Sequence, residues 1–339
     1  MTALNFRPGL LLGGLMLAVA ILLLAPHQAY AWGPGTHVLL GVEVLRSLDL
    51  VPAAVASLLN AHPAEFLYGN LAADISMAKK YAPIGRHCHH WHVAREIRQS
   101  AGGDPRLEAA ATGYLCHLAA DVVAHNRFVP RMLLLTSSTR GLGHSYWEHR
   151  MDVQLGGEGL SLARRIVTEF DHGEIDALLD RVLSHTLFSF RTNRRIFRGL
   201  IRIGDYRRWQ VIFDTVIDNS RWELDRDEGL CYLAASYNHV IDFLRHGDDS
   251  ETATGDPIGE AALLKAMEIR RAVVRHEGWS VGTRLESTAN RYFPLPESPS
   301  GQWSRRGRTA QSADDAIRTT LTGGGSAALR GPGRRGTGS

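Results

Sequence analysis

Histidine and acidic residues recur at four-residue spacing along this chain. In the stretch GYLCHLAADVVAHNR (residues 113–127), His117, Asp121 and His125 are each four residues apart. On an α-helix they lie within an arc of about 80° and extend over roughly 12 Å of its axis. One metal ion cannot contact all three, so we expect His117 and His125 to bind different ions, with Asp121 able to bridge. The neighbours are Ala, Leu and Val, among which an aspartate without a cation would be a costly buried charge.

An alternative interpretation makes His117 and His125 ordinary hydrogen-bonded core histidines and Asp121 an unrelated cap or ion-pair partner. That interpretation would be preferred for a single histidine. Three metal-binding residue types on one apolar helix face favour the metal site.

A second stretch, GHSYWEHRMD (residues 143–152), places His144 and Glu148 at i and i+4 on one helical face. Many helices pair His with Glu, so this spacing alone is weak evidence for a metal site. It supports one only in combination with the first stretch. We assign His149 and Asp152 to other faces of the same helix, where they would face solvent or serve packing.

A third stretch combines an aspartate with a histidine-rich segment. Asp74 lies in GNLAADIS, and four of six positions around Trp91 are histidines: His87, His89, His90 and His92. Such a tract is typical of metal binding, but not all of its side chains can face inward. Cys88 is a soft donor within the tract, and we regard it as a less favoured ligand.

Residues 1–31 are predicted to be a cleaved signal peptide. Arg7 precedes an apolar run from Gly9 to Ala25, and the small-residue pattern Ala29-Tyr30-Ala31 is typical of a cleavage site. The apolar run is also about as long as a short membrane span, so a retained N-terminal membrane anchor is the alternative.

Cleavage after Ala31 would make Trp32 the first residue of the stretch WGPGTH. The α-amino group that is then created has a pKa of about 7.7 to 8, so it can lose its proton and chelate a metal ion together with its own carbonyl oxygen. His37 could complete this site. The alternative is that Trp32 only packs and that His37 caps the first helix.

The elements that must position these residues are predicted to be helices. From Trp32 to about Tyr292 the apolar positions repeat at helical spacing, and we find no convincing alternating strand. The chain after that is rich in Pro, Gly and Arg and lacks the apolar residues needed for a core. We therefore expect an all-α domain over residues 32–292 and a disordered tail over residues 293–339.

Composition and charge limit the function classes. The chain has 339 residues, 44% of them hydrophobic, which is ample for a buried core. Its net charge is +3, but the tail from Pro294 carries +4 and Arg7 another +1, which leaves −2 for the segment between them. A nearly neutral body offers no global field for a nucleic acid. Three cysteines, Cys88, Cys116 and Cys231, argue against a disulfide framework.

In this order, the four stretches resemble the zinc-dependent phospholipase C family, which shares a fold with the fungal and plant single-strand nucleases. The resemblance covers residues 32–155, and more loosely the helical remainder to about residue 290. It implies a multi-helix, all-α bundle around a cleft that holds three zinc ions, with the mature N-terminal tryptophan as a ligand.

The family pattern assigns each candidate residue to one of the three ions. The first ion would be held by Asp74, His89 (or His90), His117 and Asp121, the second by His125, His144 and Glu148, and the third by Trp32, His37 and Asp121. Asp74 would also orient or deprotonate the attacking water.

The chain departs from the commonest family pattern in one spacing. The second-metal histidine usually follows the bridging aspartate by six residues, whereas Asp121 and His125 are four apart. This shorter form looks more like the catalytic domain of glycosylphosphatidylinositol phospholipase D and its bacterial relatives. Within the histidine tract we favour His89, fifteen residues after Asp74, over His90 and then His87.

The leading hypothesis is a secreted or periplasmic zinc hydrolase of phosphate esters, namely a phospholipase C that acts on phospholipid head groups. The expected partners are a phospholipid or other phosphodiester substrate and, transiently, a membrane surface, with no nucleic-acid partner. One alternative is a nuclease or nucleotidase of the same fold, which the basic run between Arg191 and Arg202 favours. Another is a non-catalytic zinc-binding protein. The plain interpretation of those arginines is a solvated helix face.

Overall fold

The computed structural model describes most of the chain between Trp32 and Glu297. The described residues are 32–76, 79–136, 140–184, 186, 188–204, 222–277 and 281–297. Every regular element among them is helical and none is a strand, so the predicted all-α fold is confirmed. The predicted signal peptide, and the predicted tail from residue 298 onward, lie outside the described residues.

The helices follow one another through short connections. The α-helices are α2 (Pro34–Leu45), α3 (Ala53–Ala61), α4 (Pro63–Ala72), α5 (Trp91–Ser100), α6 (Pro105–Val123), α7 (Val129–Thr136), α8 (Arg140–Gln154), α9 (Glu158–Glu169), α10 (Gly173–Val182), α11 (Phe190–Gly204), α13 (Arg226–His246), α14 (Glu260–Glu277) and α15 (Val281–Tyr292). Short 3₁₀ turns lie at Leu48–Leu50, Lys79–Tyr81, Gly247–Asp249 and Thr252–Thr254.

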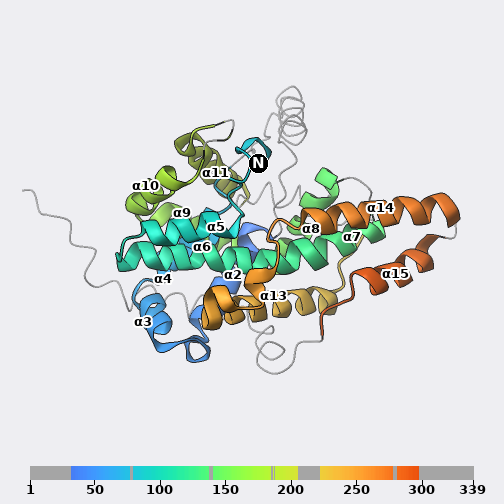
Figure 1. Cartoon of the computed structure of the whole chain (residues 1–339), viewed down its shortest axis with the longest axis horizontal. Helices are drawn as coiled ribbons and strands as arrows, with labels where there is room; N and C mark the ends of the chain where they lie inside the picture. The colour runs from blue at the N-terminus through green and yellow to red at the C-terminus, as the bar shows by residue number, and fades with distance from the viewer. Residues whose placement is uncertain are drawn as a thin grey trace, which may run out of the picture.

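Helix α6 is the central element, and α4, α13 and α5 pack most extensively against it (Figure 1). It begins with Pro105 in its first turn and with Asp104 as its cap, whose side chain accepts the N–H groups of Arg106 and Leu107. Every residue from Gly113 to Val123 is buried. A helix that is buried all round belongs in the middle of a domain, so the HxxxD spacing on α6 faces protein rather than solvent.

Helices α4 and α6 approach each other closely because glycine occupies the crossing point on both. A Cβ at Gly69 would lie 2.0 Å from Ala110 O, and one at Gly113 would lie 2.0 Å from Phe66 O. The close approach brings the carbonyl of Asn70 within reach of the α6 side chains.

A smaller apolar cluster joins α7 to α14 and α15 at the right-hand end of the molecule in Figure 1. It consists of Leu134, Ala266, Leu285, Ala289 and Phe293. Phe293, one residue past the predicted end of the domain, is buried, and its carbonyl accepts a hydrogen bond from Arg131. The packed body thus includes Phe293.

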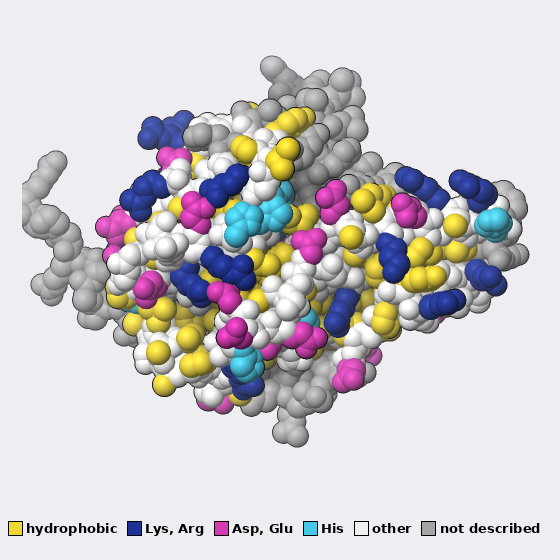
Figure 2. Space-filling view, viewed as in Figure 1, with side chains coloured by type: hydrophobic (Ala, Val, Ile, Leu, Met, Phe, Trp, Pro, Cys, Tyr) yellow, Lys and Arg dark blue, Asp and Glu magenta, His cyan; other side chains and the backbone are white. Residues whose placement is uncertain are grey.

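Basic and acidic side chains are interspersed on the face of the molecule that Figure 2 shows. None of the helices in the described ranges is long and apolar enough to cross a bilayer. The three cysteines are buried, and no disulfide joins them within the described residues.

Candidate metal centre

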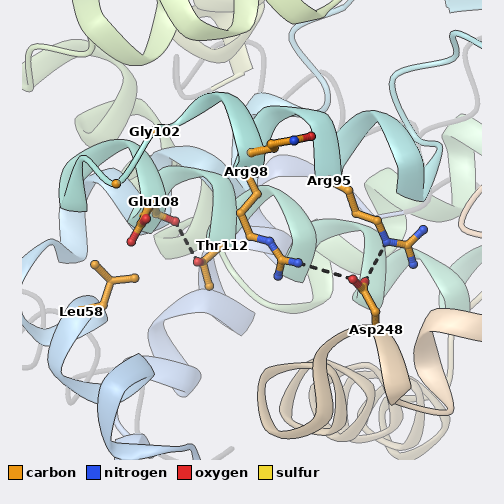
Figure 3. Close-up of a pocket in the computed structure, with 9 residues that line it drawn as sticks. Leu58, Arg95, Arg98, Gly102, Glu108, Thr112 and Asp248 are labelled. Atoms are coloured by element: carbon orange, nitrogen blue, oxygen red, sulfur yellow. Dashed lines mark hydrogen bonds and ion pairs between the residues drawn. The ribbon is translucent and has the colours of Figure 1, made fainter.

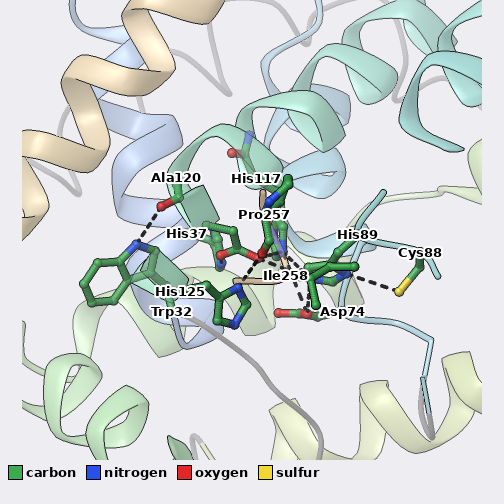
Figure 4. A network of polar contacts seen from close by, with 12 residues as sticks. Trp32, His37, Asp74, Cys88, His89, His117, Ala120, His125, Pro257 and Ile258 are labelled. Atoms are coloured by element: carbon green, nitrogen blue, oxygen red, sulfur yellow. Dashed lines mark hydrogen bonds and ion pairs between the residues drawn. The ribbon is translucent and has the colours of Figure 1, made fainter. Parts of the chain in front are cut away.

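A buried polar cluster brings His37, His89 and His117 together (Figure 4), and the two carboxylate oxygens of Asp121 face different members of it. Asp121 Oδ1 is 3.3 Å from His37 Nε2, whereas its Oδ2 is 3.2 Å from His89 Nε2 and 3.2 Å from His117 Nε2. All four side chains are at most 1% exposed. Neither oxygen accepts a hydrogen bond of good geometry from the described residues. This arrangement is that of a carboxylate able to bridge two metal ions.

Asp74 completes one of these sets. His89 Nε2 lies 3.1 Å from His117 Nε2 and 3.4 Å from Asp74 Oδ1, and His117 Nε2 lies 3.8 Å from the same oxygen. Ligands about 2.0 to 2.2 Å from a tetrahedral zinc ion are about 3.3 Å from one another. The donor atoms of His89, His117 and Asp121 are therefore close enough together for one metal ion, and Asp74 lies beside two of them.

Backbone carbonyls fix the tautomers of two candidate histidines. His117 Nδ1 donates to Asn70 O at 2.8 Å, and His125 Nδ1 donates to Pro257 O at 2.5 Å. Each donation leaves Nε2 with a free lone pair, as in metal-binding histidines. His125 Nε2 is buried and makes no hydrogen bond within the described chain.

A π-helical turn, η3 (Ala124–Phe128), carries His125 toward α8. The expected continuous α-helix through His117, Asp121 and His125 is wrong, since α6 ends at Val123 and α7 begins only at Val129. The rings of His125 and His144 are 5.2 Å apart, and His144 Nε2 is 3.0 Å from Glu148 Oε1. The structure thus brings the three candidate residues of the second ion together.

The N-terminal stretch docks against α6 and α13. Trp32 is fully buried, and its Nε1 donates to Ser236 Oγ at 3.1 Å and to Ala120 O at 3.3 Å. Its ring stacks on Phe128, as the packing alternative expects. His37 does not cap a helix, because it lies inside α2 with its ring stacked 3.7 Å from that of His117.

The histidine tract divides into an inward and an outward part. His89 is fully buried among the donors of the cluster, whereas His90 and His92 stack on each other with partly or fully exposed side chains. Cys88 Sγ lies 3.2 Å from His89 Nδ1, so it contacts the ring nitrogen that faces away from Asp121. The geometry thus places His89, and not His90, beside Asp74.

Lys79 was not anticipated from the sequence. It is 3% exposed, and its Nζ lies 2.6 Å from Asp74 Oδ1 and 3.3 Å from His89 Nε2. A signal was present, because only three of the 38 basic residues are lysines and one of them follows Asp74 by five positions.

The pKa values of the cluster follow from burial and from these contacts. Burial opposes ionisation of Asp74 and Asp121, but nearby cationic groups outweigh it. Lys79 and His117 hold the pKa of Asp74 well below the usual range, and His117 does the same for the pKa of Asp121. Burial lowers the pKa of His37 and that of His125 to about 4, so both rings are neutral at pH 7. These four groups are thus in the states that bind metal ions. In the metal-free protein two other candidates are not, because burial raises the pKa of Glu148, and the contacts of His89 with Cys88, Asp121 and Asp74 raise its pKa against the effect of burial.

Asp152 is a further buried residue whose role the sequence interpretation missed. It does not face solvent, because it accepts hydrogen bonds from the backbone N–H of Gly35 at 3.2 Å and from that of Thr36 at 2.8 Å. The four-residue spacing that singled out His117, Asp121 and His125 continues from His144 and Glu148 to Asp152. The same rule would have placed Asp152 on the face of Glu148.

A separate groove of about 600 Å³ lies on α5 and α6 (Figure 3). Arg95 and Arg98 line it, and both pair with Asp248. None of the candidate metal-binding residues lines this groove.

A family model described as zinc dependent phospholipase C matches residues 36–239, which is more than half of the chain. The matched range contains every candidate donor except Trp32. No curated protein and no solved structure matches the chain.

Proposed function

Since the chain belongs to the zinc-dependent phospholipase C family, and is thus a zinc-dependent phosphoric ester hydrolase, we propose that it is a phospholipase C with three zinc ions. It acts outside the cytoplasm, on phospholipid head groups at a membrane surface that it contacts transiently. The observation that supports the trinuclear centre is that the two oxygens of Asp121 face different imidazoles, Oδ1 that of His37 and Oδ2 those of His89 and His117.

The donor chemistry supports zinc. Imidazoles and carboxylates without a thiolate requirement are a common zinc donor set. The buried oxygens of Asp121 and the buried Nε2 of His125 lack good hydrogen bonds within the described residues, and a bound cation would satisfy them. The proposed ligands are Asp74, His89, His117 and Asp121 for the first ion; His125, His144 and Glu148 for the second; and Trp32, through its terminal amine and carbonyl, His37 and Asp121 for the third.

Zinc in such a centre supplies Lewis acidity to a phosphoryl oxygen and lowers the pKa of a water molecule. The protein fixes the geometry, because the carbonyls of Asn70 and Pro257 hold His117 and His125 in the tautomer with a free Nε2. Asp74, kept ionised by Lys79, orients the attacking water or takes its proton.

Substrate class is tested with protein that begins at Trp32 and contains zinc. Phosphatidylcholine vesicles and single-stranded DNA are offered separately, and release of phosphocholine and of nucleotides is measured. We expect release of phosphocholine, abolished by a chelator and restored by zinc. Release of nucleotides alone would identify a nuclease, and zinc binding without turnover of either substrate would identify a non-catalytic zinc protein.

The ligand assignment is tested with neighbouring histidines. His89→Ala should remove one zinc ion and lower turnover by more than about 100-fold, because the first ion loses a direct ligand. His90→Ala, the matched control from the same tract, should keep zinc content and turnover. The reverse pattern would assign the ligand to His90.

Asp121→Asn tests the bridge. Since two ions would share this carboxylate, its neutralisation should lower zinc content by more than one ion per chain and abolish turnover. Loss of a single ion would contradict the bridging role.

A further inference from the structure

Helix α2 has no capping side chain of its own. It begins at Pro34, and its N-cap is Gly33, so the N–H groups of its first turn need partners from elsewhere. Asp152 on α8 supplies them, because its Oδ2 accepts from Gly35 N at 3.2 Å and its Oδ1 accepts from Thr36 N at 2.8 Å and from Thr36 Oγ1 at 2.6 Å. A buried carboxylate thus lies at the positive end of the α2 dipole.

The glycines of WGPG leave the space that this contact requires. A Cβ at Gly33 would lie 2.1 Å from Asp152 Oδ2, and one at Gly35 would lie 3.2 Å from Asp152 Cγ. Gly33 has a φ of −68°, which any residue can adopt. Glycine is required at this position because there is no room for a side chain, and not because of the backbone conformation. The N-terminal stretch and Asp152 therefore fit each other across 117 positions of sequence.

Asp152 lies where the N-terminal stretch meets the candidate metal centre. On α8 it follows Glu148 by one helical turn. The stretch that it holds begins at the buried Trp32 and ends at His37, whose Nε2 is 3.3 Å from Asp121 Oδ1. Movement of the first turn of α2 would shift both Trp32 and His37.

We propose that Asp152 is a positioning residue for the third zinc ion: by holding Gly35 and Thr36 it keeps the Trp32 amine and the His37 imidazole on one ion. This role rests on the proposed trinuclear centre. We assign Asp152 no zinc ion of its own, because both of its oxygens accept hydrogen bonds from the first turn of α2.

The test is zinc content and affinity, measured in zinc buffers on proteins that begin at Trp32. Asp152→Asn keeps the size of the side chain but removes its charge. Its NH₂ group replaces one carboxylate oxygen and cannot accept the hydrogen bond that this oxygen accepted from α2. We expect the variant to retain two zinc ions and to bind the third about 10- to 100-fold more weakly, which is the usual effect of replacing a residue that positions a metal ligand. Gly33→Ala should give the same result, because its Cβ would displace the carboxylate.

Asp225→Asn is the matched control. Asp225 also caps a helix, since its Oδ1 accepts the N–H groups of Asp227 and Glu228 at the start of α13, but it is exposed and is the N-cap of its own helix. It should leave three zinc ions at wild-type affinity and change the thermal midpoint of unfolding little, because the asparagine oxygen can still accept both N–H groups.

Wild-type zinc content and affinity in both Asp152→Asn and Gly33→Ala would overturn the proposal. If one variant fails to fold, as judged by circular dichroism, the other decides alone. A wild-type protein with only two zinc ions would contradict the trinuclear centre itself, and this role of Asp152 with it.

Discussion

Lys79 places a buried ammonium beside Asp74, with 2.6 Å between Nζ and Oδ1. Lys79→Met would leave that carboxylate without its cation in zinc-free protein, which should lower the free energy of unfolding by about 3–5 kcal/mol. The loss should be smaller with zinc present, because the metal ion then compensates Asp74. Urea unfolding in a chelator and in zinc measures both values.

Lys265→Met is the control for Lys79. Lys265 is exposed on α14, with its Nζ 5.2 Å from the centre of the Tyr292 ring. We expect a change of about 0.5 kcal/mol or less in either condition. An equal loss of stability for Lys79→Met with and without zinc would mean that Asp74 is not a metal ligand.

His172 gives the protein a dependence on pH that is separate from the metal centre. Its Nε2 donates to Ile166 O at 2.7 Å, and its ring stacks on Tyr68 at 3.7 Å. Burial lowers its pKa from 6.5 to about 4. The unfolded chain therefore takes up a proton before the folded one, so the contribution is complete above pH 6.5 and is lost as pH falls toward 4.

His172→Phe keeps the stacked ring and removes the titration. The difference in unfolding free energy between wild type and variant should change by about 3 kcal/mol between pH 7 and pH 4. Urea unfolding at intervals across this range measures it, and a difference that stays constant with pH would contradict the assignment.

Some residues of the candidate site could be predicted from spacing within one helix, and others could not. Four-residue spacing singled out His117, Asp121, His144 and Glu148, because an α-helix converts that spacing into one face. The contacts of Lys79 and Asp152 depend on how separate segments fold together, which spacing within one helix does not contain. Membership of His89 in the cluster, rather than His90, likewise depends on the turn before α5.

The crossing of α4 and α6 connects packing to the metal centre. Gly113→Ala would place a Cβ 2.0 Å from Phe66 O, so the helices must separate. We expect the free energy of unfolding to fall by about 1–3 kcal/mol or more. Zinc affinity should fall too, because Asn70 O on α4 fixes His117 on α6. Urea unfolding and a zinc titration measure the two effects.

Gly199→Ala on α11 is the matched control, since nothing lies within 4 Å of the added Cβ. It should leave zinc affinity unchanged and stabilise the protein by about 0.5–1 kcal/mol, because alanine is the better helix former. Equal effects of the two substitutions would contradict the tight crossing.

The helices themselves were predictable, whereas the π-helical turn η3 was not. Periodicity and proline positions report which segments are helical. The turn is held by distant groups, because His125 Nδ1 donates to Pro257 O and Asn126 Nδ2 donates to Asp256 O at 2.6 Å. A Cβ at Gly259 would lie 2.4 Å from His125 O, so this distant segment packs directly on the turn. No window of local sequence contains such contacts.

At the scale of the whole molecule, zinc binding and turnover should depend on removal of residues 1–31, because the α-amino group of Trp32 is a proposed zinc ligand. In protein that begins at Ala31 this amine becomes a peptide nitrogen, whose lone pair is committed to amide resonance. We expect weaker binding of the third zinc ion and lower turnover than in protein that begins at Trp32. The two proteins are compared at equal zinc concentration, and equal zinc content with equal turnover would show that the terminal amine is not a ligand.

The central claim is a trinuclear zinc centre that hydrolyses phosphate esters, and counting metal ions tests it most directly. Zinc per chain is determined on protein that begins at Trp32, together with phosphocholine release from the same sample. We predict close to three zinc ions per chain, with turnover lost on chelation and restored by zinc. Full turnover with about one zinc ion per chain would contradict the trinuclear centre.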